Sequence, residues 1–207
     1  PRYAGTTKLG YASGAPEPAR NTVMRTLIAI ELPEATRREL QGMVEHLRRS
    51  GIRASWVRPD RMHLTLRFLG EIDDDQAGIA GEFLAKGCSG ISAFECAVQG
   101  AGAFPDVRHP SVIWAGVGPL EGGLSEVQTV AEKSAASIDL KPENRPFRPH
   151  LTLGRIRRPE EAGQLGPALA PLADFHGRPF RVAGVTLFSS TLTPQGPLYE
   201  RIRECRF

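Results

Sequence analysis

The chain has few cysteines and no long apolar run, and these two absences exclude several classes of protein. Its three cysteines, Cys88, Cys96 and Cys205, are an odd number without CxxC spacing. This argues against a disulfide framework and against a structural zinc site. No stretch approaches the roughly 18 consecutive apolar residues that a membrane-spanning helix needs. We therefore expect a soluble protein without membrane contact, and the reducing cytoplasm is the simplest compartment for it.

The chain also lacks a strong excess of charge. Its net charge is +3, from 26 basic and 23 acidic residues. Arginine supplies much of the basic charge and gathers in two clusters, Arg145, Arg148, Arg155, Arg157 and Arg158, and Arg201, Arg203 and Arg206. The planar guanidinium group donates paired hydrogen bonds and suits phosphate. Ordinary surface charge explains a single arginine equally well, so the clusters alone do not identify nucleic acid as the partner.

The N-terminal segment differs in composition from the rest of the chain. Residues 1–23 are rich in glycine, proline, alanine and threonine, whereas Met24 opens the strand-like run MRTLIAIEL. No apolar signal-peptide core precedes Met24. We expect residues 1–23 to be a disordered extension or tag. Residues 24–207 are expected to form a single bilobal domain, which their number allows.

Apolar periodicity predicts alternating strands and helices after Met24. In the expected helix 34–49, four apolar residues share one face, and Gly51 follows as a common helix terminator. The other expected helices span 73–87 and about 121–138. The expected strands span residues 24–32, 63–70, 92–101, 111–117, 150–156, 180–189 and 198–206.

One four-residue string occurs twice, as HLTL at His63 and again at His150. Each copy lies in an expected strand that a polar, helix-compatible segment follows. The repeat looks like a duplicated lobe. It predicts an α+β protein with two pseudo-symmetric lobes, each an antiparallel sheet with flanking helices, around a central active-site cleft.

The alternation of side chains along a strand divides each HLTL copy between two faces. His63 and Thr65 point to one face and the two leucines to the other, and His150 and Thr152 repeat the arrangement. The leucines can anchor each strand in the core. A pseudo-two-fold axis between the lobes would bring the four polar side chains to one cleft.

These four side chains can carry out the hydrolysis of a phosphodiester. The reaction needs a base for water, an acid for the leaving oxygen, and donors to the non-bridging oxygens. An unperturbed histidine titrates near pH ~6.5, so one of the pair can be neutral while the other is protonated. A strained ribose 2′,3′-cyclic phosphate suits two histidines that work without a metal. The near symmetry leaves open which histidine is the acid and which the base.

The remaining three histidines are expected at the surface. His46 lies on the charged helix 34–49, and His109 and His176 lie in segments that contain proline and glycine. The HxT motifs also bring no carboxylates at metal-ligand spacing, so no metal is expected.

Longer stretches around these motifs match a known family. They are RTLIAIELP (25–33), HLTLRFLG (63–70), AFP (103–105) with VIWAGV (112–117), FRPHLTLGR (147–155) and GPLYERI (196–202). Through them the chain resembles the two-histidine phosphoesterase superfamily. Within it, the chain is similar to the bacterial and archaeal RNA 2′,3′-cyclic phosphodiesterases historically called 2′-5′ RNA ligases. The resemblance covers nearly all of residues 24–207.

The resemblance implies a role for each site residue. His63 would donate a proton to the leaving oxygen, His150 would accept one from water, and Thr65 and Thr152 would bind the phosphate. The arginine five positions after the second histidine, Arg155, would also bind phosphate.

Simple alternation contradicts this role for Arg155, because it gives the arginine the same face as Leu151 and Leu153. A strand end or a bulge at Gly154 would resolve the conflict. The equivalent residue after the first histidine is Phe68. We expect Phe68 to be a core residue, and stacking on a base is the alternative.

The implied function is hydrolysis of RNA 2′,3′-cyclic phosphate ends to 2′-phosphomonoesters, by a monomer that uses no cofactor. The RNA could be a tRNA fragment, and small cyclic nucleotides are a second substrate class. One alternative is ATP-independent 2′-5′ RNA ligation at the same site, since the ATP-binding string GxxxxGK[ST] is absent. Another is a catalytically silent RNA-binding module, against which the intact His and Thr quartet argues.

Overall fold

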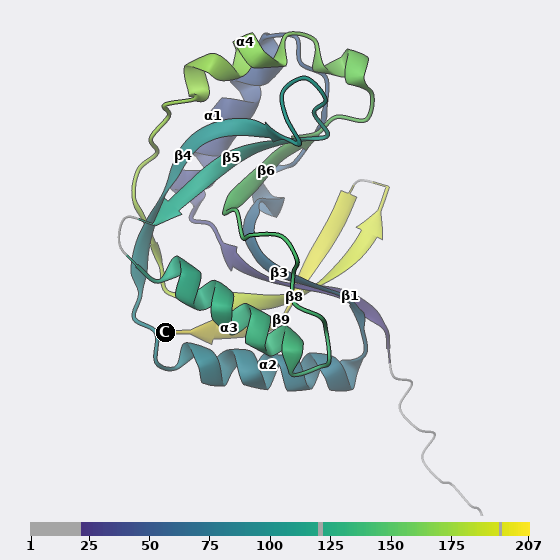
Figure 1. Cartoon of the computed structure of the whole chain (residues 1–207), viewed down its shortest axis with the longest axis vertical. Coiled ribbons are helices and arrows are strands. Elements are labelled where there is room, and N and C mark those ends of the chain that lie inside the picture. The colour runs from purple at the N-terminus through teal and green to yellow at the C-terminus, as the bar shows by residue number, and fades with distance from the viewer. Residues whose placement is uncertain (1–21, 120–121, 195) are drawn as a thin grey trace, which may run out of the picture.

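The computed structural model describes residues 22–119, 122–194 and 196–207. They form two antiparallel sheets with helices against them (Figure 1). The four-stranded sheet has the order β3-β1-β8-β9, and the five-stranded sheet has the order β2-β6-β5-β4-β7. The strands of the first sheet are β1 (Met24–Glu31), β3 (His63–Ile72), β8 (Gly184–Thr193) and β9 (Gly196–Arg206). Those of the second are β2 (Ser55–Trp56), β4 (Phe94–Phe104), β5 (Val112–Pro119), β6 (His150–Arg155) and β7 (Phe180–Val182).

Each sheet has its own helices. The helices are α1 (Glu34–Arg49), α2 (Asp74–Cys88), α3 (Leu124–Ala136) and α4 (Leu165–Leu169). Helices α2 and α3 contact each other and the four-stranded sheet, and we call this unit the His63 lobe. Helices α1 and α4 contact each other, and α1 contacts β6 of the five-stranded sheet, so this unit is the His150 lobe. The predicted α+β fold of two lobes is confirmed.

Local sequence signals explain where α1 ends and where α2 begins. Gly51 has a φ of +80°, a conformation that glycine adopts without strain, and it follows α1 as predicted. Helix α2 begins with a capping box at Asp73. The Asp73 carboxylate accepts from the Gln76 backbone N–H (2.8 Å), and the Gln76 side chain accepts from the Asp73 N–H (3.2 Å).

The leucines of both HLTL strings are buried, as strand alternation predicts. Leu64, Leu151 and Leu153 are inaccessible to solvent, and Leu66 is nearly so. All four belong to the core that extends through both lobes. Because their leucines are fixed in this core, β3 and β6 hold their polar side chains at the opposite face.

One predicted strand is wrong. Residues 180–189 form two strands, with β7 paired to β4 in the His150 lobe and β8 paired to β1 in the His63 lobe. The chain therefore crosses between lobes at Ala183. Both strands contribute apolar residues to the same core, so their hydrophobic pattern runs on without a break. At Gly184, an added Cβ would lie 2.7 Å from the Cys205 carbonyl oxygen, which explains the glycine at the crossing.

The lobes are also not consecutive halves of the chain, contrary to the simplest form of a duplication. The His63 lobe takes β1, β3 and α2 from the first half and α3, β8 and β9 from the second. The polar segment after the second HLTL strand forms 3-10 turns and the short α4, whereas the one after the first forms the long α2. The short strand β2 and helix α4 were not predicted.

The expectation of disorder before Met24 concerns residues 1–21 almost entirely, and these lie outside the described residues. In the described part of the chain, no helix combines the length and the apolar character that crossing a membrane requires.

Candidate active site

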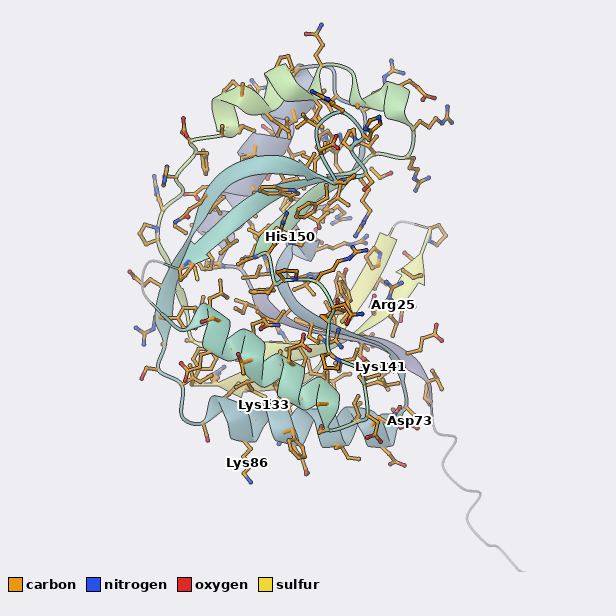
Figure 2. All side chains as sticks on the ribbon, in the orientation of Figure 1. Arg25, Asp73, Lys86, Lys133, Lys141 and His150 are labelled. Atoms are coloured by element: carbon orange, nitrogen blue, oxygen red, sulfur yellow. The ribbon has the colours of Figure 1, made fainter. Side chains whose placement is uncertain are left out.

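A cavity of about 1160 Å³ lies between the two sheets and is lined by both lobes. All five residues predicted from the sequence line it: His63, Thr65, His150, Thr152 and Arg155. The first two come from β3 and the others from β6. His150 lies in the space between the sheets in Figure 2. The structure thus brings together residues that stand 87 positions apart in the sequence, from His63 to His150.

The two histidines have the same hydrogen bond. The Nδ1–H of His63 donates to the Arg61 carbonyl (3.0 Å), and the Nδ1–H of His150 donates to the Arg148 carbonyl (2.7 Å). A carbonyl oxygen can only accept, so Nδ1 carries a proton in each ring. In the neutral form, Nε2 then has a free lone pair, and in the charged form it is a donor. Both rings are therefore prepared for proton transfer through Nε2.

An aromatic ring also packs against each histidine. The ring of Tyr199 meets His63 edge to face at 4.8 Å between centroids, and Phe104 meets His150 in the same way at 5.0 Å. These contacts restrict the orientation of the two imidazoles. Sequence reasoning did not single out either aromatic residue, although Phe104 lies in the AFP stretch and Tyr199 in GPLYERI.

A β-bulge turns Arg155 toward the cavity. The pairing of β5 with β6 slips by one residue between Thr152 and Gly154, so Leu153 is the extra residue. A bulge shifts the alternation of side chains, and Arg155 therefore shares a face with Thr152. The irregularity expected at Gly154 is present one residue earlier, and it removes the conflict between strand parity and a phosphate role for Arg155.

The first HLTL strand has a bulge at the equivalent position. The pairing of β1 with β3 slips between Thr65 and Arg67, which leaves Leu66 as the extra residue. Phe68 therefore joins the cavity lining, with 49% of its surface exposed. The expectation that Phe68 is a core residue is wrong, because the bulge at Leu66 turns its side chain toward the cavity. The same bulge takes Arg67 off the face that His63 and Thr65 share, and its side chain is buried, although it still forms part of the cavity lining.

The surroundings of His63 favour its neutral form. Burial, the largest influence, lowers the pKa of His63 below the ordinary value, and the nearby charge of Arg37 acts in the same direction. The bond to the Arg61 carbonyl and the charge of Glu31 raise it and only partly compensate. In the free protein this favours His63 as a proton acceptor, opposite to the role that the resemblance implies. A phosphate anion beside the ring would favour the protonated form.

The cavity has many more basic than acidic side chains in its lining. The arginines are Arg58, Arg61, Arg67, Arg145, Arg148, Arg155 and Arg157, and the carboxylates are Glu132 and Glu143. Both carboxylates form ion pairs with the buried Arg67. Arg58 is paired with Asp60, which is not part of the lining. The lining as a whole therefore has an excess of positive charge, which suits a ligand with several negative charges.

The second arginine cluster of the sequence lies elsewhere. It belongs to β9, and none of its three members lines the cavity. Arg201 donates to both oxygens of Glu31, at 2.8 and 2.6 Å, and Arg206 donates to Glu204 at 2.7 Å. Arg201 and Arg206 therefore act within the sheet and not toward a ligand in the cavity.

The remaining histidines differ in part from expectation. His109 and His176 are exposed, as predicted. His46 is half-buried, and its Nε2 lies 3.0 Å from the Ala168 carbonyl, so it links α1 to α4. The sequence placed His46 at the surface because α4 was not predicted. Within residues 22–119, 122–194 and 196–207, no three His, Cys, Asp or Glu side chains are grouped to hold a metal ion.

Comparisons with known proteins agree on one family. The model of the family described as LigT like Phosphoesterase matches residues 30–114 and 117–199. An RNA 2′,3′-cyclic phosphodiesterase of Thermotoga maritima is 33% identical over 89% of this chain and 96% of its own length. The protein of the same name from Methanothermobacter thermautotrophicus is 30% identical over 85% of this chain and 95% of its own length.

Solved structures show the same fold. The crystal structure of TT0787 of Thermus thermophilus aligns with a TM-score of 0.73 and 26% identity, over 88% of this chain and 97% of that one. The crystal structure of E. coli LigT complexed with 3′-AMP aligns with a TM-score of 0.65 and 23% identity, over 90% and 99% of the two chains.

Proposed function

The chain belongs to the LigT-like phosphoesterase family, and from this membership we propose that it hydrolyses RNA ending in a 2′,3′-cyclic phosphate to give a 2′-phosphomonoester. The observation that supports this most strongly is the meeting of two equivalent HxT strands across one cavity. Each strand presents a histidine with its Nδ1 proton held by a backbone carbonyl. Such a pair is suited to transfer one proton in each direction.

The proposed reaction is an in-line displacement at phosphorus. Water forms the new bond to phosphorus and gives a proton to Nε2 of His150, and the bond from phosphorus to the ribose O3′ breaks. Nε2 of His63 supplies the proton that O3′ needs. The two histidines end with exchanged protonation states, and solvent restores them before the next turnover.

The other site residues would stabilise charge on the phosphoryl group. The hydroxyls of Thr65 and Thr152 would donate to its non-bridging oxygens, and the guanidinium of Arg155 would bind one or two of them. The protonated form of His63 that this scheme needs is disfavoured by burial but favoured by the bound anion. The donor role of His63 is therefore proposed for the complex and not for the free protein.

The substrate that we propose is an RNA end and not a neutral molecule. The cavity lining contains seven arginines and two carboxylates, and the phosphates of an RNA strand could use this excess of positive charge. We propose a monomer as the acting unit, because both HxT strands belong to one chain.

An assay of the product tests this function. We expect an oligoribonucleotide with a 2′,3′-cyclic phosphate end to yield a 2′-phosphate, at equal rates with and without EDTA, because side chains make both proton transfers. Phosphorus NMR distinguishes the 2′ from the 3′ product, and the same oligonucleotide with a 3′-phosphate end is the control. A 3′-phosphate product, or loss of activity in EDTA, would contradict the proposal.

A further inference from the structure

Arg67 is a buried arginine on the strand that carries His63. Only 6% of its side chain is exposed. A guanidinium removed from water is unstable unless partners compensate for the lost hydration. Arg67 has such partners on two separate segments. Its Nε lies 3.3 Å from a Glu132 carboxylate oxygen on α3, Nη1 donates to Glu143, and Nη2 donates to the Lys141 carbonyl.

The segment that Arg67 binds leads directly to the second histidine. Residues 141–149 contain no regular helix or strand and join α3 to β6, which begins at His150. Figure 2 shows Lys141 beside the His63 lobe and His150 between the two sheets. The segment thus passes from one lobe to the other. It also contributes Arg145, Phe147 and Arg148 to the cavity lining.

The two ends of this segment are held differently. Arg67 binds its beginning through Lys141 and Glu143, and the Val117 N–H donates to the Pro149 carbonyl at its end (3.1 Å). Phe147 packs against the core between these points. The Arg148 carbonyl, which accepts the His150 Nδ1 proton, belongs to the same segment. A shift of the segment would therefore change the orientation of the His150 ring.

We propose that Arg67 is a positioning residue that couples the two HxT strands, by fixing the segment that orients His150 to the strand that carries His63. The inference rests on the proposed function. The bulge at Leu66 makes this coupling possible, because the shift in alternation takes Arg67 off the face that His63 and Thr65 share. The two bulges then have different consequences, since the equivalent residue of β6 is Gly154, which has no side chain.

Hydrogen exchange tests the coupling without reference to activity. In Arg67→Met, amides between Lys141 and His150 should exchange about tenfold faster than in the wild type, whereas those of α1 should not change. Glu143→Ala is a second variant in case Arg67→Met folds poorly, because the Glu143 side chain is 51% exposed and its removal leaves Arg67 paired with Glu132. Unchanged exchange in this segment in folded Arg67→Met or in Glu143→Ala would overturn the proposal.

Kinetics test the positioning role. We expect Arg67→Met to lower kcat about 100-fold, since misplacement by about 1 Å has effects of that size, with KM within about threefold. Glu143→Ala should lower kcat about tenfold, and Arg67→Lys should recover part of the loss. The matched control is Glu34→Ala, which removes the partner of the surface arginine Arg38 on α1.

The outcomes separate this proposal from the proposed function. Faster exchange with an unchanged kcat would overturn the positioning role. A fall in kcat no larger than the fall in the fraction of folded protein would also overturn it. If the wild-type protein converted no cyclic phosphate, the proposed function would fail, and the exchange measurement would still decide whether Arg67 fixes the segment.

Discussion

His63→Ala and His150→Ala are each expected to lower kcat for a cyclic-phosphate oligonucleotide by about 10²–10⁴-fold, the usual contribution of a general acid or base. Each variant removes one of the two Nε2 atoms through which protons would move. KM should change much less, because the hydroxyls and Arg155 would still bind the phosphate. The double variant should be little worse than either single variant, since groups that act as a unit are not additive.

The control for both is His109→Ala, which removes an exposed histidine in the loop between β4 and β5. It should retain wild-type kcat and KM. Retention of activity in either His63→Ala or His150→Ala would exclude that histidine from the reaction.

The dependence of kcat/KM on pH identifies the role of each histidine. The wild type should show a bell, with an acid limb from the base and an alkaline limb from the acid. Loss of the alkaline limb in His63→Ala would establish His63 as the donor. Loss of the acid limb would make it the acceptor, as the lowered pKa of His63 in the free protein favours.

Arg155→Met is expected to lower kcat/KM about 100-fold. The guanidinium can donate two parallel bonds to a phosphoryl group whose negative charge grows in the transition state. Arg155→Lys should recover only part of the loss, because an ammonium group does not reproduce the planar pair of donors.

Phe68 occupies the equivalent place on β3 and should have a different effect. Stacking of a base on an aromatic ring contributes about 1–3 kcal/mol. Phe68→Ala should therefore raise KM about tenfold and leave kcat nearly unchanged. The result would mean that the substrate places its base near β3 and its phosphate near Arg155.

Two residues outside the cavity provide matched controls for Arg155→Met and Phe68→Ala. Arg38→Met alters an exposed arginine on α1, and Phe83→Ala alters a phenylalanine on α2 that is 54% exposed. Neither should change kcat or KM. Equal effects of Arg155→Met and Arg38→Met would show that the loss comes from general charge and not from a phosphate contact.

The grouping of the five predicted residues around one cavity could be foreseen, because its signal in the sequence is short and local. Strand alternation in HLTL was enough to place the leucines in the core, and the repetition of the string placed both polar pairs at one cleft. The side chains beyond Leu66 and Leu153 could not be placed in this way. A bulge depends on the pairing with a neighbouring strand, and a single strand carries little sign of it. Phe68 was therefore misplaced in the core.

Long-range pairing explains the other differences. Residues 180–189 look like one strand because β7 and β8 bury apolar side chains in the same core, although they join different sheets. The contacts of Arg67 could not be foreseen either. Its partners Glu132, on α3, and Glu143, in the segment before β6, are more than 60 residues away in the sequence. Only the complete fold brings them next to β3.

A crystal structure with a nucleoside 2′-monophosphate, the product that we propose, tests the central claim most directly. We expect the phosphate to lie within about 3.2 Å of Nε2 of both His63 and His150, with the hydroxyls of Thr65 and Thr152 on its oxygens. A phosphate bound to one histidine alone, or outside the cavity between the sheets, would contradict the claim that the two HxT strands act on one phosphorus atom.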